Sequence, residues 1–219
     1  MSTDTTEVPN TIDEIEEKQV VIINNIQPPG PDEKSLRTLN LYGDITETKA
    51  EEVVNGLLFL QNTSEILIYP EDETKEPYTE NKPISLYVST HGGNASDMFS
   101  IIDVMESIKT QTCDVCTYGV GKVMSAGVLI LSAGTVGKRK VGENCRIMLH
   151  NVIAGSSGTI FTLENELEEI KWIQERYIHC LSKYTKLTKP KIKKMLKDQR
   201  DVYISAEDAI KYGIVDEII

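Results

Sequence analysis

The segment Ile84-Ser-Leu-Tyr-Val-Ser-Thr-His-Gly-Gly-Asn94 contains the pattern on which the rest of the chain is built. Residues 84–88 predict a strand, and the paired glycines that follow predict a tight turn. Asn94 is a favoured N-cap for a helix over about 95–109. The inward face of that helix carries Phe99, Ile102, Met105 and Ile108. A strand, a glycine turn and an amphipathic helix in this order are typical of βαβ units.

The same alternation continues on both sides of this segment. Upstream, residues 36–41 predict a strand that ends at Gly43. The capping-box pattern Thr48-Lys-Ala-Glu51 then predicts a helix, whose apolar face comprises Val53, Val54, Leu57, Leu58 and Leu60. Downstream, strands are predicted at 115–119, 146–149 and 202–205, and helices at about 126–134, 160–185 and 206–212. A further short helix is predicted to begin after Thr188, with Pro190 in its first turn. The fold class is therefore α/β with a largely parallel sheet.

Two segments fall outside this alternation. Residues 62–82 are polar and acidic and include Pro70 and Pro77, so we expect a long loop, which in a compact domain is usually functional or disordered. Residues 1–35 form an acidic N-terminal segment, of which 1–18 are expected to be disordered or ordered by a partner. The predicted organisation is thus this segment followed by one domain over 36–219.

Charge excludes some classes of partner. The chain has 219 residues and a net charge of −11. Residues 1–82 hold 18 of the 34 acidic residues but only 6 of the 23 basic ones, and the remainder is close to neutral. Nucleic-acid binding needs a basic surface, so it is not expected. No apolar run is long enough to span a membrane, and the acidic start is not a secretory signal. We expect a cytoplasmic protein, or one in an organelle stroma or matrix.

The cysteines and one glycine-rich stretch do not predict a cofactor site. Cys113 and Cys116 form a CxxC pair, but a zinc site would need a second pair, and the surrounding residues predict a strand. The four cysteines are therefore interpreted as structural thiols. Gly119-Val-Gly-Lys122 lacks the residues of a phosphate-binding loop, because Cys116 and Val123 stand where Gly and Ser or Thr are needed. No metal or cofactor is expected.

Ser125 is the candidate nucleophile. It follows a strand and opens an apolar helix, flanked by Met124, Ala126 and Gly127. At a helix start, free backbone N–H groups and the helix dipole favour a developing oxyanion. The alternative is that Ser125 is only a helix N-cap. Paired glycines such as Gly92 and Gly93 can likewise either direct N–H groups at an anion or form a tight turn.

A serine nucleophile needs a base, and the chain offers three histidines. His150 ends a predicted strand before a glycine-rich loop, His179 lies among charged residues of the long helix, and His91 lies in the Gly-Gly turn, where it could contact substrate. A carboxylate that orients the imidazole would complete a triad. Asp201 precedes a predicted strand, but position alone does not separate it from the other carboxylates.

Taken together, these motifs resemble the proteolytic subunit of the Clp protease, the ClpP family. The resemblance covers about 36–219 and rests on Ser89-Thr-His-Gly-Gly93, Val123-Met-Ser-Ala-Gly127, Gly137-Lys-Arg139, Met148-Leu-His-Asn151, and the stretch from Gln199-Arg-Asp201 to Tyr212-Gly-Ile-Val-Asp216. It implies a crotonase-like ββα spiral with a protruding handle helix at about 160–185. Residues 62–82 are then an insertion, and the absence of a G-x-S-x-G motif disfavours an α/β-hydrolase.

The resemblance also implies roles for individual residues. Ser125, His150 and Asp201 would form the catalytic triad, and the backbone N–H groups of Gly93 and Ala126 would form the oxyanion hole. Gly92 and Met98 would contact substrate. The chain would then be a serine endopeptidase that needs no cofactor.

At the level of assembly, the resemblance implies two stacked heptameric rings that enclose the active sites. An AAA+ unfoldase would deliver unfolded polypeptides, and residues 1–35 would lie near the axial pore. Two alternatives remain: a weakly active or structural subunit that co-assembles with a paralogue, and a crotonase-type acyl-CoA enzyme, which would not need all three triad residues.

Overall fold

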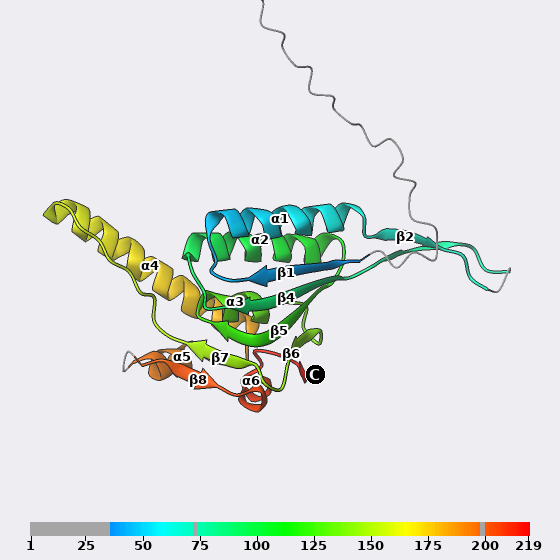
Figure 1. Cartoon of the computed structure of the whole chain (residues 1–219). Helices are drawn as coiled ribbons and strands as arrows, with labels where there is room; N and C mark the ends of the chain where they lie inside the picture. The colour runs from blue at the N-terminus through cyan, green and yellow to red at the C-terminus, as the bar shows by residue number, and fades with distance from the viewer. Residues whose placement is uncertain (1–35, 72–73, 198–199) are drawn as a thin grey trace, which may run out of the picture. The chain divides into compact units, whose positions relative to one another are not determined.

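The computed structural model describes residues 36–71, 74–197 and 200–219, so the predicted N-terminal segment 1–35 lies outside the described residues. A seven-stranded sheet has the order β1–β4–β5–β6–β9, with β7 beside β5 and β8 beside β7 (Figure 1). Neighbouring strands are parallel except β7 and β8. The predicted α/β class with a mostly parallel sheet is therefore confirmed. The strands are β1 (Thr38–Tyr42), β4 (Ile84–Thr90), β5 (Val115–Met124), β6 (Arg139–Val141), β7 (Arg146–Leu149), β8 (Val202–Ile204) and β9 (Glu217–Ile218).

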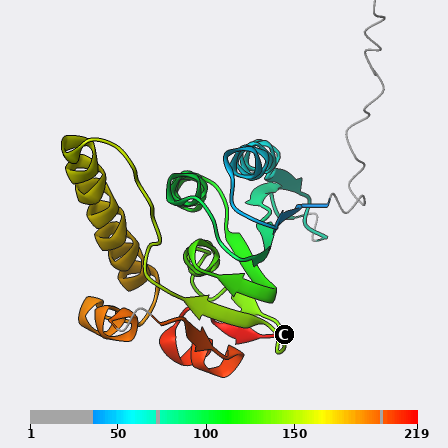
Figure 2. The ribbon, with the colours of Figure 1, turned by 60° about the vertical axis from the view of Figure 1, so that its left-hand side comes forward.

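Helices α1 (Glu47–Asn62), α2 (Ala95–Gln111) and α3 (Ala126–Ser132) cover one face of the sheet. The other described helices are α4 (Ile160–Tyr184), α5 (Lys189–Leu196) and α6 (Ala206–Tyr212). Figure 2 shows α1, α2 and α3 on the same side of β1, β4 and β5. Along β4, Leu86 and Val88 are fully buried, whereas Tyr87 between them is half-buried and stacks on Tyr118. Among the described helices, none combines the length and apolar character needed to cross a bilayer.

The predicted start of the first helix is wrong by two residues. Thr46, not Thr48, is the N-cap of α1, and its hydroxyl accepts a hydrogen bond from the Lys49 N–H. The helix begins early because Ile45 is buried and pairs with Gly93 at the edge of the sheet. The predicted apolar face is correct except at Leu58, whose side chain is exposed.

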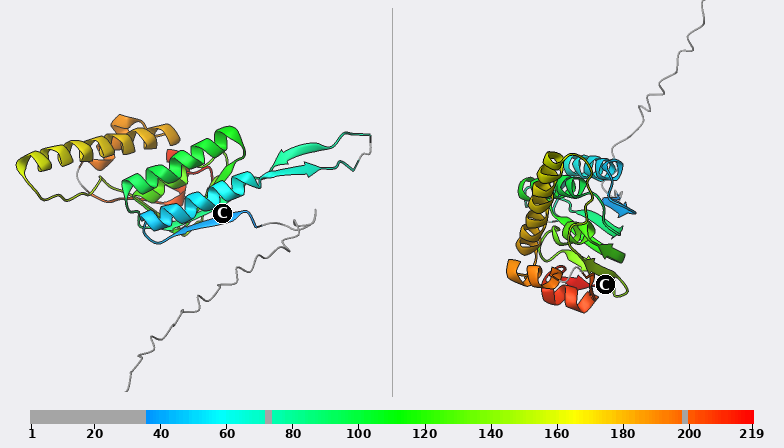
Figure 3. Two further views of the ribbon diagram at one scale, coloured as in Figure 1. Left: turned by 90° about the horizontal axis from the view of Figure 1, so that it is seen from above. Right: turned by 90° about the vertical axis from the view of Figure 1, so that its left-hand side faces the viewer.

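Residues 62–71 and 74–82 contain secondary structure where the sequence predicted a loop. They include the end of α1 and an antiparallel hairpin of β2 (Glu65–Ile68) and β3 (Tyr78–Asn81). This hairpin extends away from α1 and α2 (Figure 3). Its base is held by the Arg37 guanidinium, which donates to the carbonyl oxygens of Leu60 at 2.6 Å and Pro83 at 3.2 Å. Strand β2 only alternates between exposed and half-buried residues, and every residue of β3 is exposed, so neither strand carries a strong apolar pattern.

Strand β5 is also longer than predicted. The predicted strand 115–119 continues to Met124, with a register shift against β4 between Val88 and Thr90. Gly121 permits this continuation because its φ is +64°. The extension matters for the site, because it brings Ser125 to the end of the strand. The short strands β6 and β9, which pair with each other, were not predicted.

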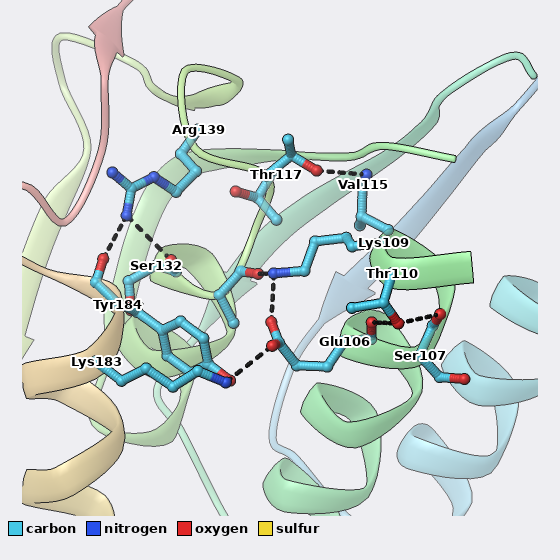
Figure 4. A network of polar contacts seen from close by, with 12 residues as sticks. Glu106, Ser107, Lys109, Thr110, Val115, Thr117, Ser132, Arg139, Lys183 and Tyr184 are labelled. Carbon is cyan, nitrogen blue, oxygen red and sulfur yellow. Dashed lines mark hydrogen bonds and ion pairs between the residues drawn. The ribbon is translucent and has the colours of Figure 1, made fainter. Parts of the chain in front are cut away.

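A polar network joins the C-terminal end of α4 to α2 and the sheet (Figure 4). The Glu106 carboxylate on α2 pairs with Lys109 on its own helix and with Lys183 on α4, the latter at 2.8 Å. The Arg139 guanidinium donates to the carbonyl oxygens of Ser132 at 3.1 Å and Tyr184 at 2.6 Å. The last turn of α4 is thereby held against the body of the domain.

Glu106 is expected to make stability depend on pH. Partial burial raises the pKa of its carboxyl, but contacts with Lys109 and Lys183 outweigh burial and hold the pKa below the usual value. The contribution to stability is therefore present above the unfolded pKa of about 4.3 and is lost as pH falls through the lower folded pKa. Thermal unfolding of Glu106→Gln should occur a few degrees below the wild type at pH 7.

The difference in unfolding temperature between the wild type and Glu106→Gln should disappear as pH falls below about 4. Lys183→Met, which removes the partner on α4, should weaken the same pH dependence. A gap between wild type and Glu106→Gln that stays constant from pH 7 to pH 3 would contradict this assignment.

Candidate active site

Ser125 lies in a strained turn between β5 and α3. Its φ is +54° and its ψ is −122°, the single positive φ of a non-glycine residue in the described chain. Such a conformation costs about 1–3 kcal/mol and persists only where the surroundings impose it. Here the Ser125 N–H donates to the Met148 carbonyl oxygen at 2.8 Å, and the Ser125 carbonyl accepts from Val128 N–H at 3.0 Å. Strain held in this way is typical of functional positions.

The N-cap interpretation of Ser125 is not supported. Ser125 occupies the N-cap position of α3, but its side chain makes no cap hydrogen bond. By contrast, the side chains of the N-cap residues Thr46, Asn94 and Thr159 each accept a hydrogen bond from a backbone N–H of the helix that follows. The Ser125 hydroxyl is thus left available for another role.

Strand topology explains why residues distant in sequence meet here. Strands β4, β5 and β7 are parallel neighbours, so their carboxyl ends lie at one edge of the sheet. The turn at Gly92, the residue Ser125 and the residue His150 follow those three strands in turn. A ligand site at this edge is the general expectation for open α/β sheets.

Gly92 packs directly against Ser125. A Cβ atom at Gly92 would lie 2.7 Å from the Ser125 Cβ and 3.1 Å from its Oγ. Two hydrogen bonds hold the backbone of Gly92. Its N–H donates to the Thr90 hydroxyl at 2.9 Å, and its carbonyl oxygen accepts from the Ile45 N–H at 2.8 Å. Gly92 also has a φ of +105°. Only glycine satisfies both the conformation and the close approach.

Two backbone N–H groups beside Ser125 are unpaired. Within the described chain, neither the Gly93 nor the Ala126 N–H donates to any acceptor. Both residues line the cavity that contains Ser125. Unpaired N–H groups at a helix start can stabilise a negative oxygen. Gly93 cannot carry a side chain, because a Cβ there would lie 2.2 Å from the Ile45 carbonyl oxygen.

The cavity has a volume of about 410 Å³ and contains most of the predicted site. Ser125, His150, Gly93, Ala126 and Met98 all line it. The rest of the lining includes the apolar residues Val152, Ile153, Ala154, Ile170, Ile173 and Tyr177. The cavity therefore offers an apolar space for a side chain next to the Ser125 hydroxyl.

His150 and Asp201 end two antiparallel neighbours. Leu149 on β7 pairs with Val202 on β8, so the next position in that register sets His150 opposite Asp201. Both residues line a second cavity, of about 760 Å³, which Ser125 does not reach. In the described chain, no hydrogen bond joins the Ser125 hydroxyl to His150, or His150 to the exposed Asp201.

The loop after His150 is held by two side chains. The Asn151 side-chain amide donates to the Leu196 carbonyl oxygen, and the Gln174 side-chain oxygen accepts from the Val152 N–H, each at 2.7 Å. These contacts tie the loop to α5 and α4. The two other histidines lie in different places. His91 is exposed and lines the 410 Å³ cavity, whereas His179 is exposed on α4 outside it.

The cysteines agree with the structural interpretation. All four are free and buried, and burial raises the pKa of each thiol. Across the described residues, no cluster of three or more His, Cys, Asp or Glu side chains could hold a metal ion.

One residue of the site was missed. Tyr177 on α4 is not among the predicted site residues, yet its hydroxyl donates to the Ser125 carbonyl at 3.2 Å. Spacing in α4 predicts that Tyr177 faces inward but carries no signal for a contact with Ser125, 52 residues away.

Replacing Gly92 by alanine should damage the site more than the fold. The new Cβ would displace Ser125, and a displacement of about 1 Å can cost about 10²-fold in rate. Gly43→Ala is the matched control, because Gly43 has a φ of +84° but nothing within 4 Å of its Cβ position. Peptide hydrolysis and thermal unfolding should separate the two variants. Equal hydrolysis rates would show that Gly92 does not set the position of Ser125.

The fold and this cavity together define a class: an α/β protein with a serine and a histidine at the carboxyl edge of parallel strands. A model of the Clp protease family matches residues 74–219, more than half of the chain. The chain therefore belongs to the Clp protease family. The match begins after α1 and includes every predicted site residue. Membership supports a ClpP-type peptidase of the kind that forms oligomers and works with AAA+ unfoldases.

Proposed function

We propose that this protein is a serine endopeptidase in which Ser125, His150 and Asp201 form the catalytic triad. The Ser125 hydroxyl attacks the peptide carbonyl while the His150 imidazole takes its proton. The imidazolium then protonates the leaving amine, and water hydrolyses the resulting ester by the same route. Asp201 orients the imidazole and stabilises its charged form.

The observation that carries the proposal is the shared cavity of Ser125 and His150. Gly93 and Ala126, whose N–H groups have no acceptor in the described chain, line the same cavity. These two donors would bind the oxyanion of the tetrahedral intermediate. Loss of one such donor typically costs about 3 kcal/mol of transition-state stabilisation. The register of β7 and β8, which sets Asp201 opposite His150, supports the third role.

Substrate is proposed to be unfolded polypeptide, delivered by an AAA+ unfoldase and bound as an added β-strand. Main-chain hydrogen bonds then supply most of the affinity, and the apolar cavity receives a side chain. Met98 lines that cavity and is fully buried, so it would contact the substrate side chain. Gly92, which is also buried, would act by keeping Ser125 in place.

Helix α4 supports the proposed assembly into two stacked heptameric rings. Its C-terminal part is buried at Tyr177 and Leu181, but its N-terminal part projects from the domain (Figures 1 and 3). The projecting part carries exposed apolar side chains. Those exposed side chains are Ile160, Phe161, Leu163, Leu167 and Trp172. A group of exposed large apolar side chains of this kind is expected to be covered by another subunit.

A second candidate is a weakly active or structural ring subunit that co-assembles with a paralogue. It is favoured by the missing hydrogen bonds between Ser125 and His150 and between His150 and Asp201 in the described chain. Catalytic hydrogen bonds are often long before substrate binds, so this geometry does not exclude activity. In this alternative, assembly with a partner subunit brings Ser125, His150 and Asp201 into alignment.

The reaction of Ser125 with a fluorophosphonate tests the proposal. The activated hydroxyl should displace fluoride and form a phosphonate ester, which peptide mass spectrometry would locate at Ser125. Ser96→Ala is the matched control, because Ser96 lines the same cavity and its loss should leave labelling intact. Absence of an adduct at Ser125 in the assembled protein, or an adduct at Ser96 instead, would contradict the proposal.

A further inference from the structure

Tyr177 is buried beneath the nucleophile position and makes one hydrogen bond. Its side chain is 4% exposed, and its hydroxyl donates to the Ser125 carbonyl oxygen at 3.2 Å. Burial raises the pKa of Tyr177, so the hydroxyl stays protonated and remains a donor. Within the described residues the hydroxyl has no other partner.

The oxygen that Tyr177 contacts belongs to the same peptide group as the Ala126 N–H. A peptide group is planar, and in the trans form its C=O and N–H point in opposite directions. A hydrogen bond to the Ser125 carbonyl therefore also sets the direction of the Ala126 N–H. The Val128 N–H reaches the same carbonyl oxygen at 3.0 Å, so two donors hold one side of this group.

The hydrogen bonds to the Ser125 carbonyl matter because the backbone conformation of Ser125 is strained. With φ at +54° and ψ at −122°, Ser125 is in a region that side-chain-bearing residues rarely adopt. Rotation about its ψ would relieve the strain and turn the Ala126 N–H away from the cavity.

Helix α4 presents the Tyr177 hydroxyl from a fixed position. Two turns further along the helix, Lys183 pairs with Glu106 on α2, and the Tyr184 carbonyl accepts from Arg139 (Figure 4). These contacts hold the helix beside α3.

We propose that Tyr177 is a positioning residue for the oxyanion hole: its hydroxyl holds the Ser125–Ala126 peptide group so that the Ala126 N–H faces the cavity. The inference rests on the proposed function, because it needs Ser125 as nucleophile and Ala126 as oxyanion donor. Tyr177 contacts neither the substrate carbonyl nor the reacting atoms; it acts through Ala126.

The effect should fall on the transition state and not on substrate binding. A negative oxygen develops only as Ser125 attacks, so a misdirected Ala126 N–H lowers kcat and leaves KM nearly unchanged. Tyr177→Phe should lower kcat about 3- to 10-fold, because the Val128 N–H still holds the carbonyl and a single neutral hydrogen bond contributes modestly.

The experiment compares Tyr177→Phe with Tyr184→Phe in peptide hydrolysis by the full chain. Tyr184 is the matched control, since it loses the same atom on the same helix, and among the described residues its hydroxyl is hydrogen-bonded only to the Lys183 ammonium. A peptide aldehyde, whose adduct with Ser125 carries an oxyanion, is measured with both variants. Its inhibition constant should rise in Tyr177→Phe by the factor by which kcat falls, and should not change in Tyr184→Phe.

A general loss of packing would lower the amount of active protein without changing the aldehyde constant. The inference is overturned by an unchanged kcat in Tyr177→Phe, by an equal fall in Tyr184→Phe, or by a change in KM alone. If the hydrolysis shown by the wild type persists in Ser125→Ala, the proposed function fails and takes this inference with it. An active wild type with an unaffected Tyr177→Phe variant overturns the inference only.

Discussion

Replacement of Ser125 by alanine is expected to abolish peptide hydrolysis, with a loss of about 10⁴-fold or more. The oxygen that would attack the scissile carbonyl is removed, and no other hydroxyl occupies the strained turn between β5 and α3. The measurement is hydrolysis of a short fluorogenic peptide by the wild type and by Ser125→Ala, purified in the same way. The fold should survive, because the Ser125 side chain makes no hydrogen bond in the described chain.

Three outcomes are distinguishable in this comparison. Activity that disappears in Ser125→Ala, but persists in Ser96→Ala, means that the triad is formed by this chain alone. Activity in neither the wild type nor the variant means that the residues are present but not aligned, and directs the search to a partner subunit or an unfoldase. Wild-type activity retained in Ser125→Ala would contradict the assignment of the nucleophile.

Replacement of Arg139 by leucine is expected to lower the free energy of unfolding by about 3–5 kcal/mol. The guanidinium is buried and bonds both oxygens of Asp216, from Nη2 at 2.6 Å and from Nε at 2.9 Å. It also donates to the carbonyl oxygens of Ser132 and Tyr184 (Figure 4). Leucine would leave the Asp216 carboxylate without its cation and two carbonyls without a donor.

Urea unfolding of wild type and Arg139→Leu measures this loss. Lys140→Met is the matched control: Lys140 is the next residue along β6, and its ion pair with Glu217, at 2.7 Å, is open to solvent. Such exposed pairs contribute little, so the control should unfold with the wild type. An Arg139→Leu variant as stable as Lys140→Met would show that the buried network does not hold α3, α4 and the C-terminal strand together.

The sequence by itself determined the features that depend on neighbouring residues. Apolar periodicity predicted most of the strands and helices, because each pattern reports which side of its own element is buried. Local turn chemistry identified Gly92, Gly93 and Asn94, and the serine and histidine were marked by their places at the ends of predicted strands. The resemblance to the ClpP family added Asp201, which position alone did not separate from other carboxylates.

The tertiary structure alone decided the features that join distant segments. The hairpin of β2 and β3 depends on pairing across a polar sequence, and its strands carry a weak local signal. The opposition of His150 and Asp201 follows from the register between β7 and β8. The contact of Tyr177 with Ser125 follows from the path of α4 past α3. Periodicity specifies that a side chain faces inward. Which atom the side chain contacts is set by packing between elements, because the contacting residues are distant in sequence and no local pattern records their approach.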